Sequence, residues 1–564
     1  MTAAAPASDS AAPTVATGGE RGGVRTMVRY ALRTHRWACA GVAFLGFIGP
    51  YSTGASYAKL ASTAAARASF GRQTTALGPQ LAYLVPLPLR PDTVAGYLWW
   101  KGLTWMSIVV AVWGLAAATG LIRNEEERGL METWLATPFS RVRLLFSRVG
   151  AFAIAALGAV VITAIGTAAG LAAGKATVAF PVLAEQGVSL LGLAVACFGI
   201  GLAAAQLAST RRSALALGGV VMLALYALDA LARVNPGLDG WSAISPFHLA
   251  DLTTAVVPGG HFAGAATLAL YGIAIVLIAL SALGFRRRDL LASLLPRRAG
   301  ETRVVRSAST VPLLRIPVLR TLWQQRVGLA GWAIGSIAGA AFIVSIAHAT
   351  GKLLQSAGGF TSYFAAAGTS SAATAVVTSV WLSIAAVIVA AYAITQTSHW
   401  ASEDAGGRLE MEIAQPIARW RVVAERAITL VVAAVGIAAV GSVVTGAVAP
   451  SQGVHLDTGG LVTATALLVL LALTFGALGA LVIARLPRVA VPVLAVVAVA
   501  GFYIPLFAPL FKWPSWALDL SLFHLYGTPL TTGVYWTGLW VMVAIVVVGF
   551  GGAAAAMRVR EVGR

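Results

Sequence analysis

The chain has 564 residues, of which 58% are apolar and 11% are charged, and its formal net charge is +19. Soluble proteins average about 25% charged residues, so this composition excludes a soluble domain and predicts a protein that crosses the membrane several times. The positive charges lie mostly between the apolar runs on one expected face, which favours a topology signal over nucleic-acid binding.

The N-terminal region divides into a tail and a basic helix. Residues 1–24 are rich in Ala, Ser, Thr and Pro and lack the regions of a signal peptide, which predicts a disordered cytoplasmic tail. Steps of three and four residues then place Arg25, Arg29, Arg33 and Arg36 on one helical face. This pattern predicts a helix lying on the inner leaflet of the membrane.

Six spans are expected in the first half, residues 25–288. The first covers about 37–58 and is followed by an outer loop to about 96. The second ends near Leu121, and its outer interface is expected at Trp99, Trp100 and Trp105. The next spans are expected at about 148–173, 187–208 and 213–232, and the sixth ends at the basic residues 286–288.

Residues 289–311 are polar and basic and predict a cytoplasmic linker. The second half, residues 312–564, opens with another basic amphipathic stretch and continues with six apolar runs. The spans are expected at about 327–349, 374–398, 424–448, 459–484, 489–509 and 535–557.

A polar stretch after the second span occurs twice. Residues 123–143, the first repeated segment, align without a gap with residues 401–421, the second repeated segment, 278 positions later. Phe198–Gly199 and the motif from Ser245 recur at nearly the same offset, as Phe475–Gly476 and from Ser521. These matches predict an internal duplication. The expected fold is an all-α integral membrane protein with 12 transmembrane helices in two pseudo-repeated six-helix bundles.

The distribution of basic residues predicts the orientation. If the N-terminus and both repeated segments are cytoplasmic, 31 of the 40 Lys and Arg residues lie on the cytoplasmic side. Cytoplasmic loops carry such an excess in membrane proteins. Both termini are therefore expected in the cytoplasm.

Each repeated segment has the pattern of a short amphipathic helix on the membrane surface. Its acidic residues suit the first turn of a helix, its apolar residues recur at helical spacing, and its Pro ends the helix. In the first copy these are Glu125 to Glu127, then Leu130, Met131, Trp134 and Leu135, then Pro138. A solvated loop is the alternative, but the duplication favours an element that a partner protein can grip.

The pattern Glu-x-x-x-Gly-x-x-Glu-x-x-x-Ala-x-Pro-x-x-Arg-x-Arg resembles that of ABC-2 type exporter permeases. Two such halves in one chain most resemble actinobacterial polyketide-antibiotic (tetronasin-type) exporters. The resemblance implies a type V exporter-like fold in which each repeated segment is a coupling helix that docks on an ATP-binding subunit. The implied coupling residues are Glu125, Glu126, Gly129, Glu132 and Arg141 in the first copy, and Glu403, Asp404, Gly407, Glu410 and Arg419 in the second.

The same resemblance implies a second contact with the ATPase at the turn after the fourth span of each half, through Arg211, Arg212, Arg485 and Arg488. The second copy departs from the pattern, with Glu412 where the first has Trp134. Its contact with the ATPase is therefore expected to differ.

The chain has no Walker A sequence, since the nearest fragment, Gly170 to Ala176, lacks the required Ser or Thr. It is therefore expected to be no enzyme and to bind no cofactor. ATP and Mg²⁺ are expected in a separate ABC ATPase subunit, present in two copies. Cys39 and Cys197 lie in apolar runs, so neither a disulfide nor a metal site is expected.

The substrate path is predicted from polar and aromatic residues within spans. Asp229 facing lipid at mid-span would cost about 2.5–3.5 kcal/mol, so it is expected either in a central cavity or paired with Arg233 one turn away. Tyr226, Phe502 and Tyr503 could line a cavity between the halves, or simply pack. His248 and His524, at matching positions, could bind a metal or cap the outer end.

Together with these features, the resemblance implies an exporter permease in the plasma membrane of a bacterium, moving a hydrophobic or amphiphilic, drug-like compound out of the cell. The alternatives are an ABC lipid exporter and an ion-coupled secondary carrier, which usually needs several charges within its spans. An integral-membrane enzyme would need a cluster of His, Asp, Glu or Cys, which the sequence does not show.

Overall fold

The computed structural model describes residues 18–82, 85–136, 139–290, 292–294, 315–356, 374, 377–405, 408–414, 418–454, 456–487, 489–508 and 513–559. The chain forms two compact units, Met1–Thr302 and Arg303–Arg564. Eleven described helices are long and apolar enough to cross a membrane, and a further apolar helix over Ala490–Pro505 is shorter. The prediction of an all-α, multi-span membrane protein is confirmed.

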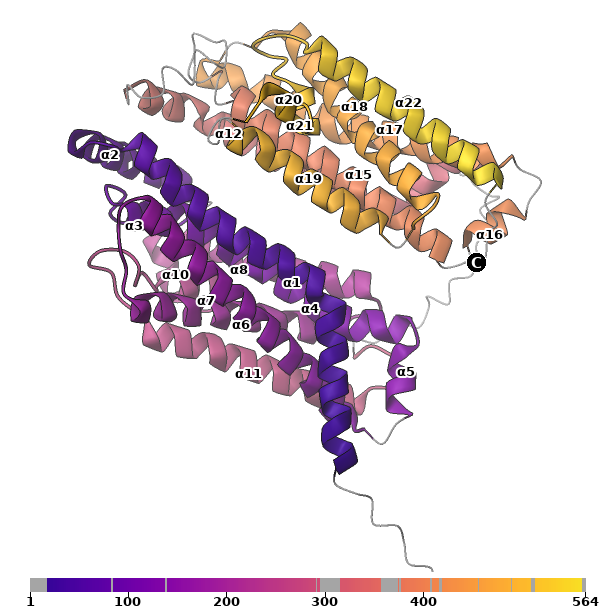
Figure 1. Ribbon diagram of the computed structural model, residues 1–564, viewed down its shortest axis with the longest axis horizontal. Helices are drawn as coiled ribbons and strands as arrows, with labels where there is room; N and C mark the ends of the chain where they lie inside the picture. Colours follow the sequence, from indigo (N-terminus) through magenta and orange to yellow (C-terminus); the bar gives the residue numbers. More distant parts are fainter. Residues whose placement is uncertain are drawn as a thin grey trace, which may run out of the picture. The chain divides into compact units, whose positions relative to one another are not determined.

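The first unit is built from six long helices, which are drawn in Figure 1. They are α1 (Gly18–Leu60), α4 (Thr104–Glu127), α6 (Arg141–Ala173), α7 (Phe180–Leu207), α8 (Arg211–Ala232) and α11 (Gly264–Arg287). Helix α1 packs along α6, while α7 contacts both α4 and α11. Helix α7 is the most buried candidate span of this unit, so the core is centred on it.

The second unit repeats this packing with α12 (Pro317–Ser356), α15 (Leu382–Ala405), α17 (Arg419–Val448), α18 (Thr458–Ile483), α19 (Ala490–Phe507) and α22 (Trp536–Val559). Helix α12 packs along α17, while α18 contacts both α15 and α22. Phe198 and Phe475, which the sequence aligns, are fully buried in the cores of their units.

The duplication extends to a detail that the sequence did not reveal. A π-helical turn, η1 (Trp99–Leu103), leads into α4, and a second, η5 (Val377–Trp381), leads into α15. The two turns lie 278 positions apart, the offset of the repeated segments. Single π turns within helices frequently occur at functional sites, and here they enter the helices that carry the repeated segments.

The region between the first two spans differs from the expected polar loop. It contains α2 (Ala64–Leu81) and α3 (Val94–Leu98). Trp99 and Trp100 were expected at the lipid interface, but they are buried beside Tyr57 and Val256. Their indole N–H groups donate to the carbonyl oxygens of Thr253 and Pro86 at 3.1 and 2.7 Å. Trp105 is exposed, as expected.

The basic N-terminal stretch is not a separate helix, because α1 runs without interruption from Gly18, and it bends before its long arm (Figure 1). Part of the expected tail, residues 18–24, is therefore helical. The predicted amphipathic face is present, since the arginines are exposed while Met27 and Ala31 are buried. Helix α12 is likewise continuous from Pro317.

Short helices close both ends of each unit. At one end lie α5 (Leu130–Leu135) and α16 (Arg408–Ile413). At the other lie α9 (Asp239–Ser242), α10 (Pro246–Asp251), α20 (Ser515–Leu518) and α21 (Leu522–Tyr526), with the 3₁₀ turns η2 (Pro236–Leu238) and η6 (Ala449–Gln452). Figure 1 shows α5 and α10 at opposite ends of the first unit.

Candidate functional site

The two repeated segments fold alike. In the first copy, α4 ends at Glu127, the short helix α5 spans Leu130–Leu135, and α6 begins at Arg141. In the second copy, α15 ends at Ala405, the short helix α16 spans Arg408–Ile413, and α17 begins at Arg419. Each pair of boundaries is separated by the same 278 positions. Pro138, Gly407 and Pro416 lie outside the described residues.

The acidic residues do not occupy the position that we expected. Glu125, Glu126 and Glu127 form the last turn of α4, whereas α5 begins only after Gly129. The break between α4 and α5 falls at Gly129, which has a φ of +70°, a conformation that favours glycine. Carboxylates at a helix C-terminus are electrostatically unfavourable, so these residues need cationic partners.

One buried residue anchors each short helix to its unit. Met131 in α5 is fully buried, and its counterpart Leu409 in α16 is 1% exposed. Leu409 belongs to a small cluster with Val422 and Val423 of α17, and Met131 belongs to the main core of its unit. The short helices are therefore packed onto the bundles rather than free in solvent.

Glu125 and its counterpart Glu403 each bind an arginine of the following helix. The Arg148 guanidinium donates to Glu125 at 2.8 Å, and the Arg426 guanidinium donates to Glu403 at 2.9 Å. The side chains of the first pair are 0% and 4% exposed, and those of the second are 14% and 42% exposed. The contact is duplicated, but its burial is not.

Arg148 also connects three helices of the first unit. It donates to the backbone oxygen of Met27 in α1 at 3.1 Å. Its guanidinium lies 5.4 Å from the ring centres of both Tyr30 in α1 and Trp134 in α5. In the second unit Glu412 replaces Trp134, and Arg426 lies over Trp400 of α15 instead.

Glu126 is held by two arginines. Arg123 donates to it at 2.8 Å, and Arg288, just after α11, donates to both of its oxygens, at 3.0 Å for one of them. Arg288 also donates to Gln206 of α7 at 2.6 Å. All of these groups are buried. In the second unit, Asp404 replaces Glu126 and Ala401 replaces Arg123.

In the first unit, the expected secondary contact lies beside this network. Glu127 accepts a hydrogen bond from the backbone N–H of Arg211 at 2.7 Å, at the start of α8. Arg211 is half-buried, while Arg212 and Arg485 are exposed. Arg488 lies outside the described residues. In the first unit, the turn between α7 and α8 is therefore attached to the repeated segment.

Arg141 and Arg419 contact the last helix of their own units. Arg141 donates to the backbone oxygen of Arg288, just past the end of α11, and Arg419 donates to that of Met557 at the end of α22 at 3.2 Å. A cation suits the carbonyl end of a helix. Both arginines thus join the first residue of one span to the end of another.

Glu132 and Glu410 are the matched acidic pair whose side chains are exposed. Within the described part of the chain, neither side-chain carboxylate accepts a hydrogen bond or forms an ion pair. Glu132 and Glu410 are therefore accessible on the surface of their units, whereas Glu125 and Glu126 are buried in contacts within the first unit.

The substrate-path candidates lie at the opposite ends of the units. Asp229 is 1% exposed and is bound by Arg233, the predicted partner, and by His248 Nδ1 at 3.1 Å. Tyr226 packs edge-on against Phe247. In the second unit, Phe502 is exposed, and it contacts Tyr503 and Phe523 edge-on. Among the described residues, no group of three or more His, Cys, Asp and Glu could hold a metal.

Sequence reasoning did not identify the roles of Arg123, Arg148, Arg288 and Gln206. The conserved spacing of Arg148 and Arg426 within the repeat was a usable signal, because a basic residue that recurs with a carboxylate suggests a pair. Arg288 gave no such signal, since basic residues at the end of a span are explained by topology alone.

The bundled spans, the duplication and the two surface helices define a polytopic membrane permease. Residues 34–290 match the family model of the ABC-2 family transporter protein, and residues 314–558 match that of the C-terminal domain of the multidrug efflux system permease Rv1217c. No curated protein sequence matches the chain. The chain belongs to the ABC-2 type exporter permeases.

Proposed function

We propose that this chain supplies two membrane halves of an ATP-driven exporter, and that two copies of a separate ABC ATPase dock on it, one at α5 and one at α16. The observation that carries this proposal is the duplicated short helix, which has a buried anchor, Met131 or Leu409, and an exposed carboxylate, Glu132 or Glu410.

The contacts of the first unit explain how docking would move the spans. Trp134 of α5 contacts Arg148 of α6, which in turn binds α1, and the adjoining turn of α4 contacts the start of α8 through Glu127 and the residue after α11 through Glu126. Buried ion pairs resist separation because breaking one leaves an uncompensated charge. A displacement of α5 is therefore transmitted to several spans together.

ATP and Mg²⁺ belong to the partner in this proposal, because the sequence lacks a Walker A loop. The cargo is a hydrophobic or amphiphilic compound, which suits spans with few charges. The distribution of basic residues supports a bacterial plasma-membrane protein with both termini in the cytoplasm. Cysteines introduced as Glu132→Cys and Glu410→Cys should then react with a membrane-impermeant maleimide only from the cytoplasmic side.

The docking proposal is tested with the double variant Glu132→Arg/Glu410→Arg. We expect the cognate ABC ATPase to copurify with the wild-type chain and to be reduced at least tenfold with the double variant, since two exposed charges are reversed at the contact. Glu185→Arg, in α7 at the opposite end of its unit, is the control and should leave binding unchanged. Undiminished ATPase binding by the double variant would refute docking at these helices.

An ion-coupled carrier is the rival function, and the charged cluster around Asp229 is the observation that favours it. Transport in vesicles distinguishes the two. Transport by an exporter requires ATP on the side of the vesicle membrane where the ATPase is bound, and it continues after a protonophore is added. Transport that persists without ATP and stops with the protonophore would establish the carrier.

A further inference from the structure

The first unit contains an open cavity of about 540 Å³ at the end opposite α5. Its volume lies within the range of about 300–1,000 Å³ that is typical of small-molecule sites. Leu87, Leu89, Trp99, Leu252 and Val257 contribute an apolar wall, and Asp229, Arg233, His248 and Asp251 contribute a charged floor. An apolar pocket with a few convergent polar groups is the usual form of a ligand site.

The charged floor is held together by one arginine. Arg233 donates to Asp229, one turn earlier in α8, and to Asp251 at the end of α10 at 3.0 Å. His248 Nδ1 lies 3.1 Å from the other oxygen of Asp229. The Asp229 and Asp251 side chains are 1% and 17% exposed. The floor is therefore fixed by contacts between two helices rather than by solvent-exposed side chains.

The floor has more hydrogen-bond acceptors than Arg233 can satisfy. Arg233 donates to both carboxylates and also to the backbone oxygen of Ala82 at 3.3 Å. Among the described residues, the second oxygen of Asp251 has no hydrogen-bond donor. Arg90, at the rim, is already paired with Asp92 at 3.1 Å. With both floor carboxylates ionised and His248 and His261 neutral, the floor carries one uncompensated negative charge.

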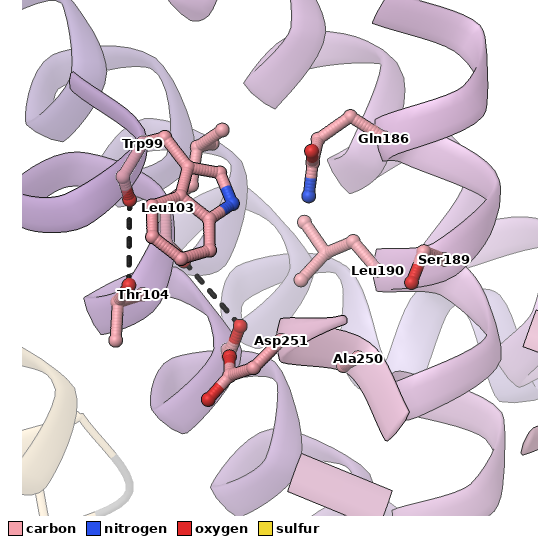
Figure 2. A pocket seen from close by; sticks show the side chains of 9 residues that line it. Trp99, Leu103, Thr104, Gln186, Ser189, Leu190, Ala250 and Asp251 are labelled. Atoms are coloured by element: carbon pink, nitrogen blue, oxygen red, sulfur yellow. Dashed lines mark hydrogen bonds between the residues drawn. The ribbon is translucent and has the colours of Figure 1, made fainter. Parts of the chain in front are cut away.

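Apart from Arg233, the two histidines of the cavity and the paired Arg90 at its rim, the described surroundings of Asp251 add no group that can carry a positive charge. Burial raises the pKa of Asp251 to about 7, with Asp229 also raising it, while Arg233 and His248 lower it. On its other side Asp251 borders a space of about 20 Å³, where Figure 2 shows Trp99, Gln186 and Asp251 around one opening. The other residues that line this small space come mainly from α4 and α7 and are uncharged. Of the remaining titratable groups, Tyr226 packs beside Arg233, and His261 lines the cavity.

We propose that this cavity binds an amphiphilic organic monocation, with its charged centre against Asp251 and its apolar groups against the leucines and Trp99. A bound cation supplies the missing charge of the floor, and an aromatic wall favours cations. The apolar wall excludes small hydrated ions in favour of organic ones. The inference relies on the proposed function only for the side of the membrane to which the cavity opens, which is the outside.

The second unit provides an internal comparison. His524 aligns with His248, but the positions aligned with Asp229 and Asp251, 276 residues later, hold Pro505 and Gly527. Both carboxylates of the floor are thus absent from the repeat. The cation site is therefore a property of the first unit alone, and the second unit supplies matched control positions.

The test measures binding of tetraphenylphosphonium to the purified full-length chain in lipid nanodiscs, without the ATPase. Tetraphenylborate, an anion of nearly the same shape, is the matched ligand. We expect the cation to bind at least tenfold more tightly than the anion. Because Asp251 must be ionised, the affinity for the cation should rise about tenfold from pH 6 to pH 8, in proportion to the ionised fraction.

Asp251→Asn should weaken cation binding at least tenfold at pH 8 and remove its pH dependence. Asp519→Asn, beside His524 in the second unit, should leave both unchanged. Leu87→Arg covers the case in which Asp251→Asn does not fold, because Leu87 is 47% exposed at the cavity wall. It should weaken binding of the cation and strengthen that of the anion.

Equal affinity for the two ions, or cation binding that neither Asp251→Asn nor Leu87→Arg changes, would overturn the inference. A failure of the cation-binding test would leave the proposed docking of the ATPase unaffected. ATPase copurification depends on Glu132 and Glu410 at the opposite end, and it should be the same for the cavity variants as for the wild type.

Discussion

The two repeated segments have the same backbone boundaries, but their ion pairs lie in different surroundings. In the first unit, Arg148 and Glu125 are enclosed by α1 and α5, with exposures of 0% and 4%. In the second, Arg426 and Glu403 are 14% and 42% exposed. The two copies share the position of the surface helix but differ in how deeply the adjoining ion pair is buried.

The opposite ends of the units show the same contrast. His248 contacts an aspartate that is 1% exposed, whereas His524 lies 3.8 Å from Asp519, which is 46% exposed. The histidine contact of the first unit is therefore desolvated on its aspartate side, whereas the histidine at the matching position of the second unit lies near an aspartate that meets water. Exposed ion pairs contribute little to stability, but breaking a buried pair is costly, so the first unit should respond more strongly to substitution.

The largest effect is expected for Glu126→Ala. This change leaves Arg123 and Arg288 buried with one carboxylate fewer between them, which should lower the free energy of unfolding by about 3–5 kcal/mol. Chemical denaturation of the chain in detergent measures the loss. The exposed neighbour Glu132→Ala is the control and should change the stability by less than about 0.5 kcal/mol. A similar loss in both variants would mean that Glu126 is not part of a buried network.

Double-mutant cycles on the two duplicated pairs compare the units directly. Glu125→Gln with Arg148→Gln should give a coupling energy of about 2–3 kcal/mol. Glu403→Gln with Arg426→Gln should give about 1 kcal/mol or less. Added salt should reduce the second coupling energy and leave the first almost unchanged, because buried pairs are poorly screened. Equal coupling energies would remove the distinction between the units.

The pH dependence of stability tests the contrast at the cavity end. The folded-state pKa of Asp251, about 7, lies above its ordinary value, so the folded state binds more protons between about pH 4 and pH 7. The free energy of unfolding of the wild type relative to Asp251→Asn should therefore fall as the pH rises through this window, by at most about 1.4 kcal/mol per pH unit. A difference that stays constant from pH 4 to pH 8 would contradict the raised pKa.

The smallest effect is expected for Trp134→Leu. Losing the aromatic face over Arg148 should lower the free energy of unfolding by about 0.5–2 kcal/mol and make the Glu125–Arg148 coupling more sensitive to salt. Trp105→Leu, at a tryptophan that is 52% exposed, is the matched control and should have little effect in detergent. If Trp134→Leu leaves the salt sensitivity unchanged, Trp134 does not shield the pair.

Much of the fold could be predicted because membrane spans are encoded locally. Runs of apolar residues gave the helices, and the gapless match of residues 123–143 with 401–421 gave the duplication. The location of Glu125 to Glu127 was predicted wrongly, because an acidic turn suits the start of one helix as well as a neutralised end of another. Their partners Arg148 and Arg288 lie 23 and 162 positions from the residues they bind, beyond the reach of periodicity.

The sequence by itself determined the class of protein, the number of repeats and the segment that each repeat exposes, because hydropathy and repetition are properties of contiguous residues. Only the tertiary structure decided which carboxylates are buried, which remain exposed, and that Asp229, Arg233, His248 and Asp251 share one cavity. Burial depends on helices that meet from distant parts of the chain, and the strength of a charge–charge contact depends on that burial more than on the identity of the two residues.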